Sequence, residues 1–182
     1  YIADFTSGYL MGTPVTYALP DNTNKIEPIL DVLKAADAPT QDSDLALDAA
    51  IFGRAYEMIY LDTEMQIKLA RLSPLNAFVV YDDTVGQMPV FGVHYYPVYT
   101  TDGDLDGYKG SFCTAEYTQQ IRLSTGYGIL QVDEPVQHPF KKVPIDEIYN
   151  DGQRFGDFER VLSLIDAYNL LQSDRVNDKE QF

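Results

Sequence analysis

The stretch YEMIYLDTEMQIKLARLSP, residues Tyr56–Pro74, decides the fold class of this 182-residue chain. Before it, apolar residues recur at helical spacing. From Tyr56 onward they alternate with polar residues, which is the period of a half-buried strand. The stretch predicts two strands joined by a turn near Asp62-Thr63, because polar turn formers interrupt the alternation there. Helices therefore precede a sheet, and we expect an α+β fold.

The region before this hairpin predicts three helices and one short strand. The helices span residues 1–12, 24–37 and 42–55, and the strand spans residues 14–20. Asp42 or Ser43 is the expected N-cap of the third helix. The apolar faces of the three helices comprise Ile2, Phe5, Tyr9, Leu10, Ile26, Ile29, Leu30, Leu33, Leu45, Ala49 and Phe52.

The region after Pro74 predicts more strands and a final long helix. The strands, which we expect to form a largely antiparallel sheet, span residues 76–83, 87–98, 116–124 and 127–134, and residues 143–150 lead out of this series. The last 26 residues, 157–182, contain no Gly or Pro. At 1.5 Å per residue they would form a helix about 39 Å long. We expect a domain over residues 1–150 and a separate helix from residue 157. Because the chain starts without Met and stops within a helical pattern, we expect it to be a fragment.

The composition restricts the classes of function. The formal net charge is −15, from 28 acidic and 13 basic residues, and the acids are spread along both halves. A surface this negative repels phosphate backbones, which argues against tight nucleic-acid binding. The single cysteine, Cys113, excludes an internal disulfide framework and a zinc knuckle. No apolar run has the length of a membrane span, so we expect no membrane association.

The segment Thr100–Cys113 resembles the start of a calcium-binding loop. Asp102, Asp104 and Asp106 alternate, and a glycine follows. The position that needs a bidentate carboxylate is Cys113, however, and the flanking residues are typical of strands rather than helices. We expect the tip of a solvated hairpin over Thr100–Gly110, with the three aspartates only weak metal candidates.

Motifs for catalysis and cofactor binding are missing. Residues 8–14 contain two glycines but lack the Lys-Ser/Thr of a phosphate-binding loop. His94 and His138 complete no metal-ligand spacing and are expected in a strand or loop. Cys113 lies in a predicted strand, where we expect a small buried residue.

Adjacent acids are the other catalytic candidates. Asp82-Asp83 and Asp133-Glu134 could flank a glycosidic bond, but both pairs lie at turn signals in an acid-rich chain. We expect no enzyme and no cofactor.

The final helix carries more apolar surface than one contact requires. Phe158, Val161, Ile165 and Tyr168 form one stripe, which we expect to dock the helix on its own domain. Leu164 and Leu171 widen this stripe, and Leu170 lies opposite it at about 100° per residue. These three leucines predict a contact with another subunit or another helix. The alternative for Leu170 is a single exposed leucine.

Five segments resemble, in the same order, the portal proteins of tailed double-stranded DNA bacteriophages, of the type common in long-tailed phages of Gram-positive hosts. They are residues 1–17, 48–62, 72–82, 142–151 and 156–182. The most specific is the run LIDAYN…SD…ND.E, which begins at Leu164. The segment Thr100–Gly110 matches no family pattern.

The resemblance implies a homo-oligomeric ring, with twelve subunits in the virion, at one vertex of the capsid. Such a ring is the channel for DNA packaging and ejection. It binds terminase during packaging, head-completion or adaptor proteins afterwards, and capsid and scaffolding proteins. Double-stranded DNA would pass through without sequence-specific binding, and assembly would take place in the bacterial host cytoplasm. Residues 1–150 would be much of the wing domain, and 157–182 the start of the first stem helix. The ATPase would belong to the terminase.

Two alternatives of other classes remain. One is an acidic carbohydrate- or calcium-binding β-rich module, which calcium-dependent thermal stabilisation would support. The other is a glycosidase-like enzyme, which turnover of a glycan would support.

Overall fold

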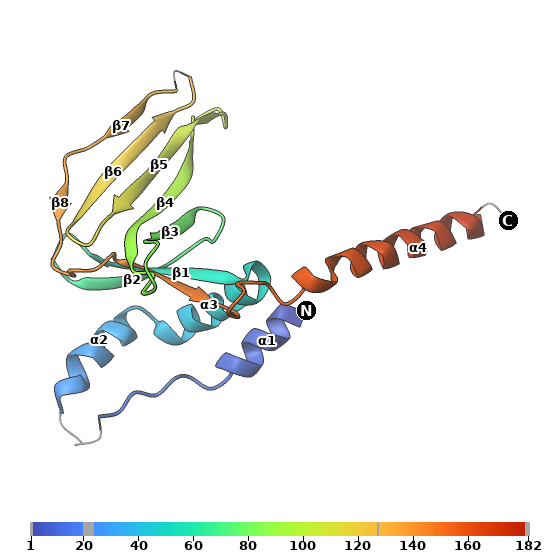
Figure 1. Ribbon diagram of the computed structural model, residues 1–182, viewed down its shortest axis with the longest axis horizontal. Coiled ribbons are helices and arrows are strands. Elements are labelled where there is room, and N and C mark those ends of the chain that lie inside the picture. The colour runs from blue at the N-terminus through green and yellow to red at the C-terminus, as the bar shows by residue number, and fades with distance from the viewer. Residues whose placement is uncertain (1, 20–23, 127, 181–182) are drawn as a thin grey trace.

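The computed structural model describes residues 2–19, 24–126 and 128–180. Within these ranges, helices precede two antiparallel sheets, and a long helix follows them (Figure 1). The expected α+β class and antiparallel pairing are confirmed. The helical elements are α1 (Ile2–Met11), η1 (Asn24–Ile26), α2 (Glu27–Ala35), α3 (Ala38–Phe52), η2 (Glu159–Val161) and α4 (Leu162–Glu180).

Helix α3 begins four residues earlier than its sequence predicts. Its first residue is Ala38, with Pro39 in the first turn, so Asp42 and Ser43 lie inside the helix and the expected N-cap is wrong. Pro is favoured in the first turn because its missing N–H has no helical partner there, which explains the earlier start. The helix ends at Gly53, which has a left-handed φ of 76° and donates its N–H to the Ala49 carbonyl at 2.9 Å.

Helix α1 packs on α3 through small residues. Ala3 and Ser7 are buried, and the Ser7 hydroxyl donates to the Ser43 carbonyl at 2.7 Å. The apolar face predicted from spacing instead points to solvent, and Tyr9 is 81% exposed. The strand predicted over residues 14–20 is wrong for residues 14–19, which pair with no described strand. Residues with strand propensity form a strand only beside a neighbouring edge, and none of the described strands offers one to this segment. Pro20 lies outside the described residues.

The strands form two sheets rather than one. The small sheet has the order β2-β1-β9, with β1 (Arg54–Leu61), β2 (Ile67–Leu72) and β9 (Ile145–Tyr149). The Asp62 carboxylate accepts hydrogen bonds from the Glu64 and Gln66 N–H groups at 2.9 Å, which closes the predicted β1–β2 turn. The large sheet has the order β3-β4-β5-β6-β7, with β8 paired to β6. Its strands are β3 (Ala77–Tyr81), β4 (Pro89–Tyr99), β5 (Leu105–Cys113), β6 (Tyr117–Ser124), β7 (Leu130–Val132) and β8 (Val136–Gln137).

The main core lies where the two sheets meet. It comprises Tyr56, Leu72, Ala77, Cys113, Val143 and Ile145. Cys113 is fully buried, as predicted, and burial raises the pKa of its thiol. A Cβ on Gly92 would lie 3.1 Å from Ile145, so this position favours the residue without a side chain.

A smaller core joins α3 to the small sheet. Leu45, Ala49 and Ala55 form it. Beside it, the buried Asp48 carboxylate receives a hydrogen bond from Arg71 Nη2 at 2.6 Å. None of the described helices combines the length and hydropathy needed to cross a membrane.

Candidate assembly surface

Helix α4 extends away from the two sheets as a separate arm (Figure 1). From Leu162 to Asn177 every side chain is exposed except Gln172, which is half-buried. The three leucines that the sequence singled out are therefore on open surface, with Leu164 68%, Leu170 65% and Leu171 63% exposed. In the described part of the chain, this helix has no packing partner for its apolar residues.

The helix starts later than predicted, and its first stripe is not docked. Regular α-helix begins at Leu162, five residues after Asp157, following the 3-10 turn η2. Ile165 is 39% and Tyr168 61% exposed, so the prediction that this stripe packs on the chain's own domain is wrong. The loop before α4 directs the helix away from the sheets (Figure 1), and its side chains from Leu162 to Asn177 are exposed apart from Gln172.

The loop that leads into α4 is fixed to the C-terminal end of α3. The Asn150 N–H donates to the Gly53 carbonyl at 3.0 Å, and the Asp157 N–H donates to the Ala50 carbonyl at 2.8 Å. The Asn150 side-chain amide donates to the Phe155 carbonyl at 3.1 Å and to Asp157 Oδ1 at 2.8 Å. These bonds join both ends of the loop, at Asn150 and Asp157, to the C-terminal end of α3.

Asp151 organises the inside of the same loop. Its Oδ1 accepts hydrogen bonds from the Gln153 N–H at 2.8 Å and the Phe155 N–H at 3.1 Å. The Phe155 N–H has the largest effect and the Gln153 N–H adds to it. Both lower the pKa of the Asp151 carboxyl because they stabilise its charged form. Arg160 Nη2 lies 3.2 Å from Asp151 Oδ2, which ties η2 to the loop.

A buried carboxylate connects the loop to the sheets. The Glu147 side chain is 2% exposed and lies between two guanidinium groups, 3.6 Å from Arg54 and 3.5 Å from Arg154. The Arg154 guanidinium also lies over the rings of Tyr81 and Tyr149, with distances of 5.5 Å and 5.2 Å to their centroids. Arg154 has a left-handed φ of 61°. A non-glycine residue holds this conformation only when its contacts fix it.

The cluster around Glu147, which comprises Arg54, Tyr81, Glu147, Tyr149 and Arg154, was not predicted from the sequence. Its members come from β1, β3, β9 and the following loop. The only sequence signal is that Glu147 and Tyr149 share the i, i+2 spacing of one strand face, which does not identify the arginines.

The aspartates of the calcium-like segment lie in a tight hairpin. The Thr100 N–H donates to the Asp104 carbonyl at 2.8 Å, and β5 begins at Leu105, so the predicted loop over Thr100–Gly110 is shorter than expected. Asp106 is already in β5 and pairs with Arg122 at 3.1 Å. In the ranges that the structure describes, no three or more His, Cys, Asp or Glu side chains are grouped as metal ligands.

The two histidines and Asp82 lie in or beside strands of the large sheet. His94 lies in β4, where burial lowers the pKa of its imidazole. His138 follows β8, with Nε2 3.0 Å from the Thr114 carbonyl oxygen. Asp82 Oδ1 accepts hydrogen bonds from the Thr84 hydroxyl at 2.8 Å and the Met88 N–H at 3.0 Å, which closes the β3–β4 turn.

The chain is similar to phage portal proteins along nearly its whole length. Residues 1–182 match the family described as "Phage portal protein, SPP1 Gp6-like". The "Portal protein" of Clostridium phage phiCD119 is 23% identical over an alignment 207 positions long, gaps included, which covers 98% of this chain and 43% of that relative. The chain therefore spans less than half the length of the relative. Because the family match covers the whole sequence, the chain belongs to the SPP1 Gp6-like family of phage portal proteins.

Proposed function

We propose that this chain is the wing and the start of the first stem helix of a larger portal subunit. Residues 1–150 are the wing domain, and residues 157–182 begin the stem helix. Copies of the subunit form a ring, with twelve members in the virion, at one vertex of the phage capsid. The ring is the channel through which the genome enters and leaves.

The observation that carries this proposal is the unpartnered apolar surface of α4. Leu164 and Leu171 lie about 20° apart around the helix, Leu170 lies roughly 100–120° away from both, and all three are exposed. Burying one leucine side chain stabilises an assembly by about 1.5–3 kcal/mol, so a helix with apolar residues on two sides favours two neighbours. In a ring, adjacent subunits and a second stem helix supply them. Leu164, Leu170 and Leu171 are the proposed subunit interface.

The ring's proposed partners follow from the family. It binds terminase during packaging and head-completion proteins afterwards, and it contacts capsid and scaffolding proteins. Double-stranded DNA slides through without sequence-specific contacts. The net charge of −15 fits this role, because few cations are present to neutralise phosphates. The subunit has no catalytic activity of its own. It assembles in the bacterial cytoplasm and remains in the virion.

The test is to express the full-length protein and examine it by negative-stain microscopy and multi-angle light scattering. We expect closed rings with a central channel. Phage in which the gene is deleted should package no DNA until the intact gene is supplied in trans. A full-length protein that stays monomeric, together with a deletion phage that still packages its genome, would refute the proposed function.

A further inference from the structure

The loop that leads into α4 also caps the C-terminal end of α3. A helix leaves its last four carbonyls without partners inside the helix. The Ala49 carbonyl accepts from Gly53, which directly follows α3, whereas the Ala50 carbonyl accepts from the N–H of Asp157, far away in the sequence. The Gly53 carbonyl accepts from the N–H of Asn150. The last turn of α3 therefore depends on the loop that carries α4.

This contact is so close that two of its positions have no room for a side chain. A Cβ on Gly156 would lie 2.5 Å from the Ile51 carbonyl oxygen and 3.1 Å from the Ala50 carbonyl oxygen. A Cβ on Gly53 would clash with the Arg154 carbonyl oxygen. The clashing atoms belong to the backbone, so no side-chain rotation relieves them. We name the two segments that meet here, residues 50–53 and 150–157, the α3 seat.

The α3 seat is bonded in turn to the base of α4. The Gly156 N–H donates to Glu159 Oε2, in η2, at 3.1 Å. Arg160 Nη2 donates to Gln153 Oε1 at 2.6 Å, and the Arg160 guanidinium lies 5.6 Å from the centroid of the Phe155 ring. Because regular α-helix begins directly after η2, these contacts act on the first turn of α4.

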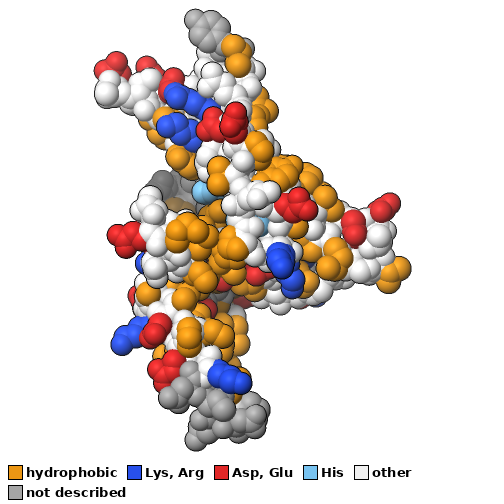
Figure 2. Space-filling view, turned by 90° about the vertical axis from the view of Figure 1, so that its left-hand side faces the viewer, with side chains coloured by type: hydrophobic (Ala, Val, Ile, Leu, Met, Phe, Trp, Pro, Cys, Tyr) orange, Lys and Arg blue, Asp and Glu red, His pale blue; other side chains and the backbone are white. Residues whose placement is uncertain are grey.

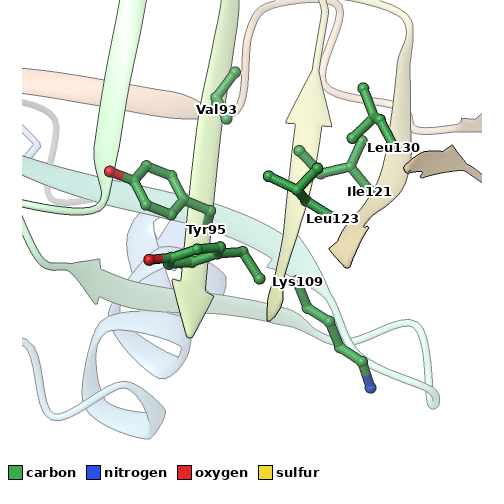
Figure 3. A pocket seen from close by; sticks show the side chains of 7 residues that line it. Val93, Tyr95, Lys109, Ile121, Leu123 and Leu130 are labelled. Carbon is green, nitrogen blue, oxygen red and sulfur yellow. The ribbon is translucent and has the colours of Figure 1, made fainter. Parts of the chain in front are cut away.

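Exposed apolar surface lies on both sides of the α3 seat. The large sheet has a hollow of about 350 Å³ on the face opposite to Cys113. Figure 3 shows apolar side chains around it, from Val93, Tyr95, Ile121, Leu123 and Leu130. Figure 2 shows hydrophobic side chains gathered in the middle of one face of the molecule. Beyond the seat, α4 carries the exposed Leu164, Leu170 and Leu171. The direction of α4 therefore sets how these two apolar surfaces are oriented relative to each other.

We propose that the α3 seat fixes the direction of α4 relative to the two sheets, so that α3 and the base of α4 move as one rigid unit. This inference rests on the proposed function, in which α4 is the stem helix, and it assigns the angle of the stem to α3. A tilt of α4 at its base would break the bond between the Asp157 N–H and the Ala50 carbonyl. An unpaired backbone group at such a close contact is costly, so the seat resists the tilt.

The distance between two spin labels in the full-length protein tests this inference. The labels are attached through Thr63→Cys, in the tight β1–β2 turn, and Ser173→Cys, on α4, and both positions are exposed. Cys113 is fully buried and is retained, and any cysteine outside residues 1–182 is replaced by serine. Labelled protein is diluted with a large excess of unlabelled protein, and subunits are separated from rings by gel filtration. Double electron–electron resonance then reports on one subunit whose α4 no neighbour holds.

Gly156→Ala is compared with Gly152→Ala, a matched control in the same loop. A Cβ on Gly152 would meet no described atom within 4 Å, so the control adds the same methyl group without touching α3. We expect one narrow distance distribution for the labelled parent protein and for Gly152→Ala, and a shifted or broadened distribution for Gly156→Ala. Asn150→Ala removes the two side-chain hydrogen bonds inside the loop and should also broaden the distribution. Cooperative urea unfolding, followed by circular dichroism, shows which variants are folded. If Gly156→Ala does not fold, Asn150→Ala decides the test.

A narrow and unshifted distribution in the folded variants would overturn the inference. A broad distribution in the labelled parent protein would also overturn it, because α4 would then have no fixed direction. Either result leaves the ring proposal intact, since ring formation is scored separately by negative stain. Conversely, a full-length protein without rings would refute the proposed function, but the distances within one subunit would still decide whether the α3 seat fixes α4.

Discussion

The carboxylate of Glu147 and the guanidinium of Arg154 lie 3.5 Å apart, at the point where the chain leaves the sheets for α4. Glu147 belongs to β9 and is almost fully buried, whereas Arg154 belongs to the loop that turns the chain outward. Their pairing, together with the backbone hydrogen bonds of Asn150 and Asp157 to α3, holds the loop that precedes a helix without a described packing partner. The direction of the proposed stem therefore depends on a contact within the domain.

Replacing Arg154 by alanine should destabilise the loop that leads into α4. In Arg154→Ala, Glu147 keeps only Arg54 as an ion-pair partner, and Tyr81 and Tyr149 lose the guanidinium between them. We expect the free energy of unfolding to fall by about 2 kcal/mol, less than the roughly 3–5 kcal/mol for breaking a fully buried ion pair, because the Arg154 side chain is 36% exposed and Arg54 remains. Urea unfolding followed by circular dichroism measures this. Arg154→Lys should lose less stability than the alanine variant because it keeps the positive charge. It should still be less stable than the wild type, because a lysine cannot stack on the tyrosine rings as a planar guanidinium does. Equal stability of the alanine variant and the wild type would show that the pair does not fix the loop.

Glu57 should make stability depend on pH. Burial, followed by the nearby Asp42 and Asp146 carboxylates, raises its pKa above the ordinary 4.5. Above the folded-state pKa, the charged Glu57 side chain destabilises the folded state. This destabilisation disappears as the pH falls from the folded-state pKa to 4.5. We expect Glu57→Gln to raise the melting temperature at about pH 7 and to have little effect at about pH 4. Asp102→Asn, on an exposed turn, serves as the control. A lower melting temperature for Glu57→Gln at neutral pH would contradict the argument.

Leu170 tests the assembly surface. In the full-length protein, Leu170→Asp should prevent normal ring formation, since a buried unpaired charge costs several kcal/mol, on the order of 3–5. The melting transition of residues 1–150 should barely move, because Leu170 is 65% exposed in the chain. Leu170→Met, which keeps an apolar side chain of similar volume, should still assemble. Rings of normal size and stability from Leu170→Asp, by light scattering and negative stain, would mean that Leu170 lies outside any interface.

Calcium should bind weakly at the β4–β5 hairpin. Asp106 is paired with Arg122, and the position of the bidentate ligand is held by the buried Cys113. We expect no site with a Kd below roughly 1 mM. Isothermal titration calorimetry checks this. Micromolar binding that Asp104→Ala abolishes would refute it.

Duplex DNA should not be retained by this chain at physiological salt. Its 13 basic residues are outnumbered by 28 acidic ones, so phosphate neutralisation is unfavourable. An electrophoretic mobility assay with micromolar protein measures this, and a polybasic DNA-binding protein provides the positive control. A salt-sensitive shift would contradict the idea of a non-adhesive channel.

The sequence by itself determined the kind of most elements. The change of period at Tyr56 separated helices from strands, and the turn at Asp62 was recognisable because Asp and Thr interrupt the alternation. Cys113 was predicted as a buried residue in a strand, which the structure confirms. The exposed leucines of α4 were also identified from spacing alone. These features depend on neighbours a few residues apart, which a linear pattern records.

The tertiary structure decided which partner each surface meets. The aromatic stripe of α1 was predicted as a packing face, yet α1 packs through Ala3 and Ser7, because small residues let two helices approach closely. The strands divide into two sheets because β9 returns to β1 from far along the chain. The ion pairs of Glu147 join residues from three separate segments. Periodicity shows which residues share a face, but the partner of that face is set by backbone pairing and packing between distant segments, which leave no local pattern.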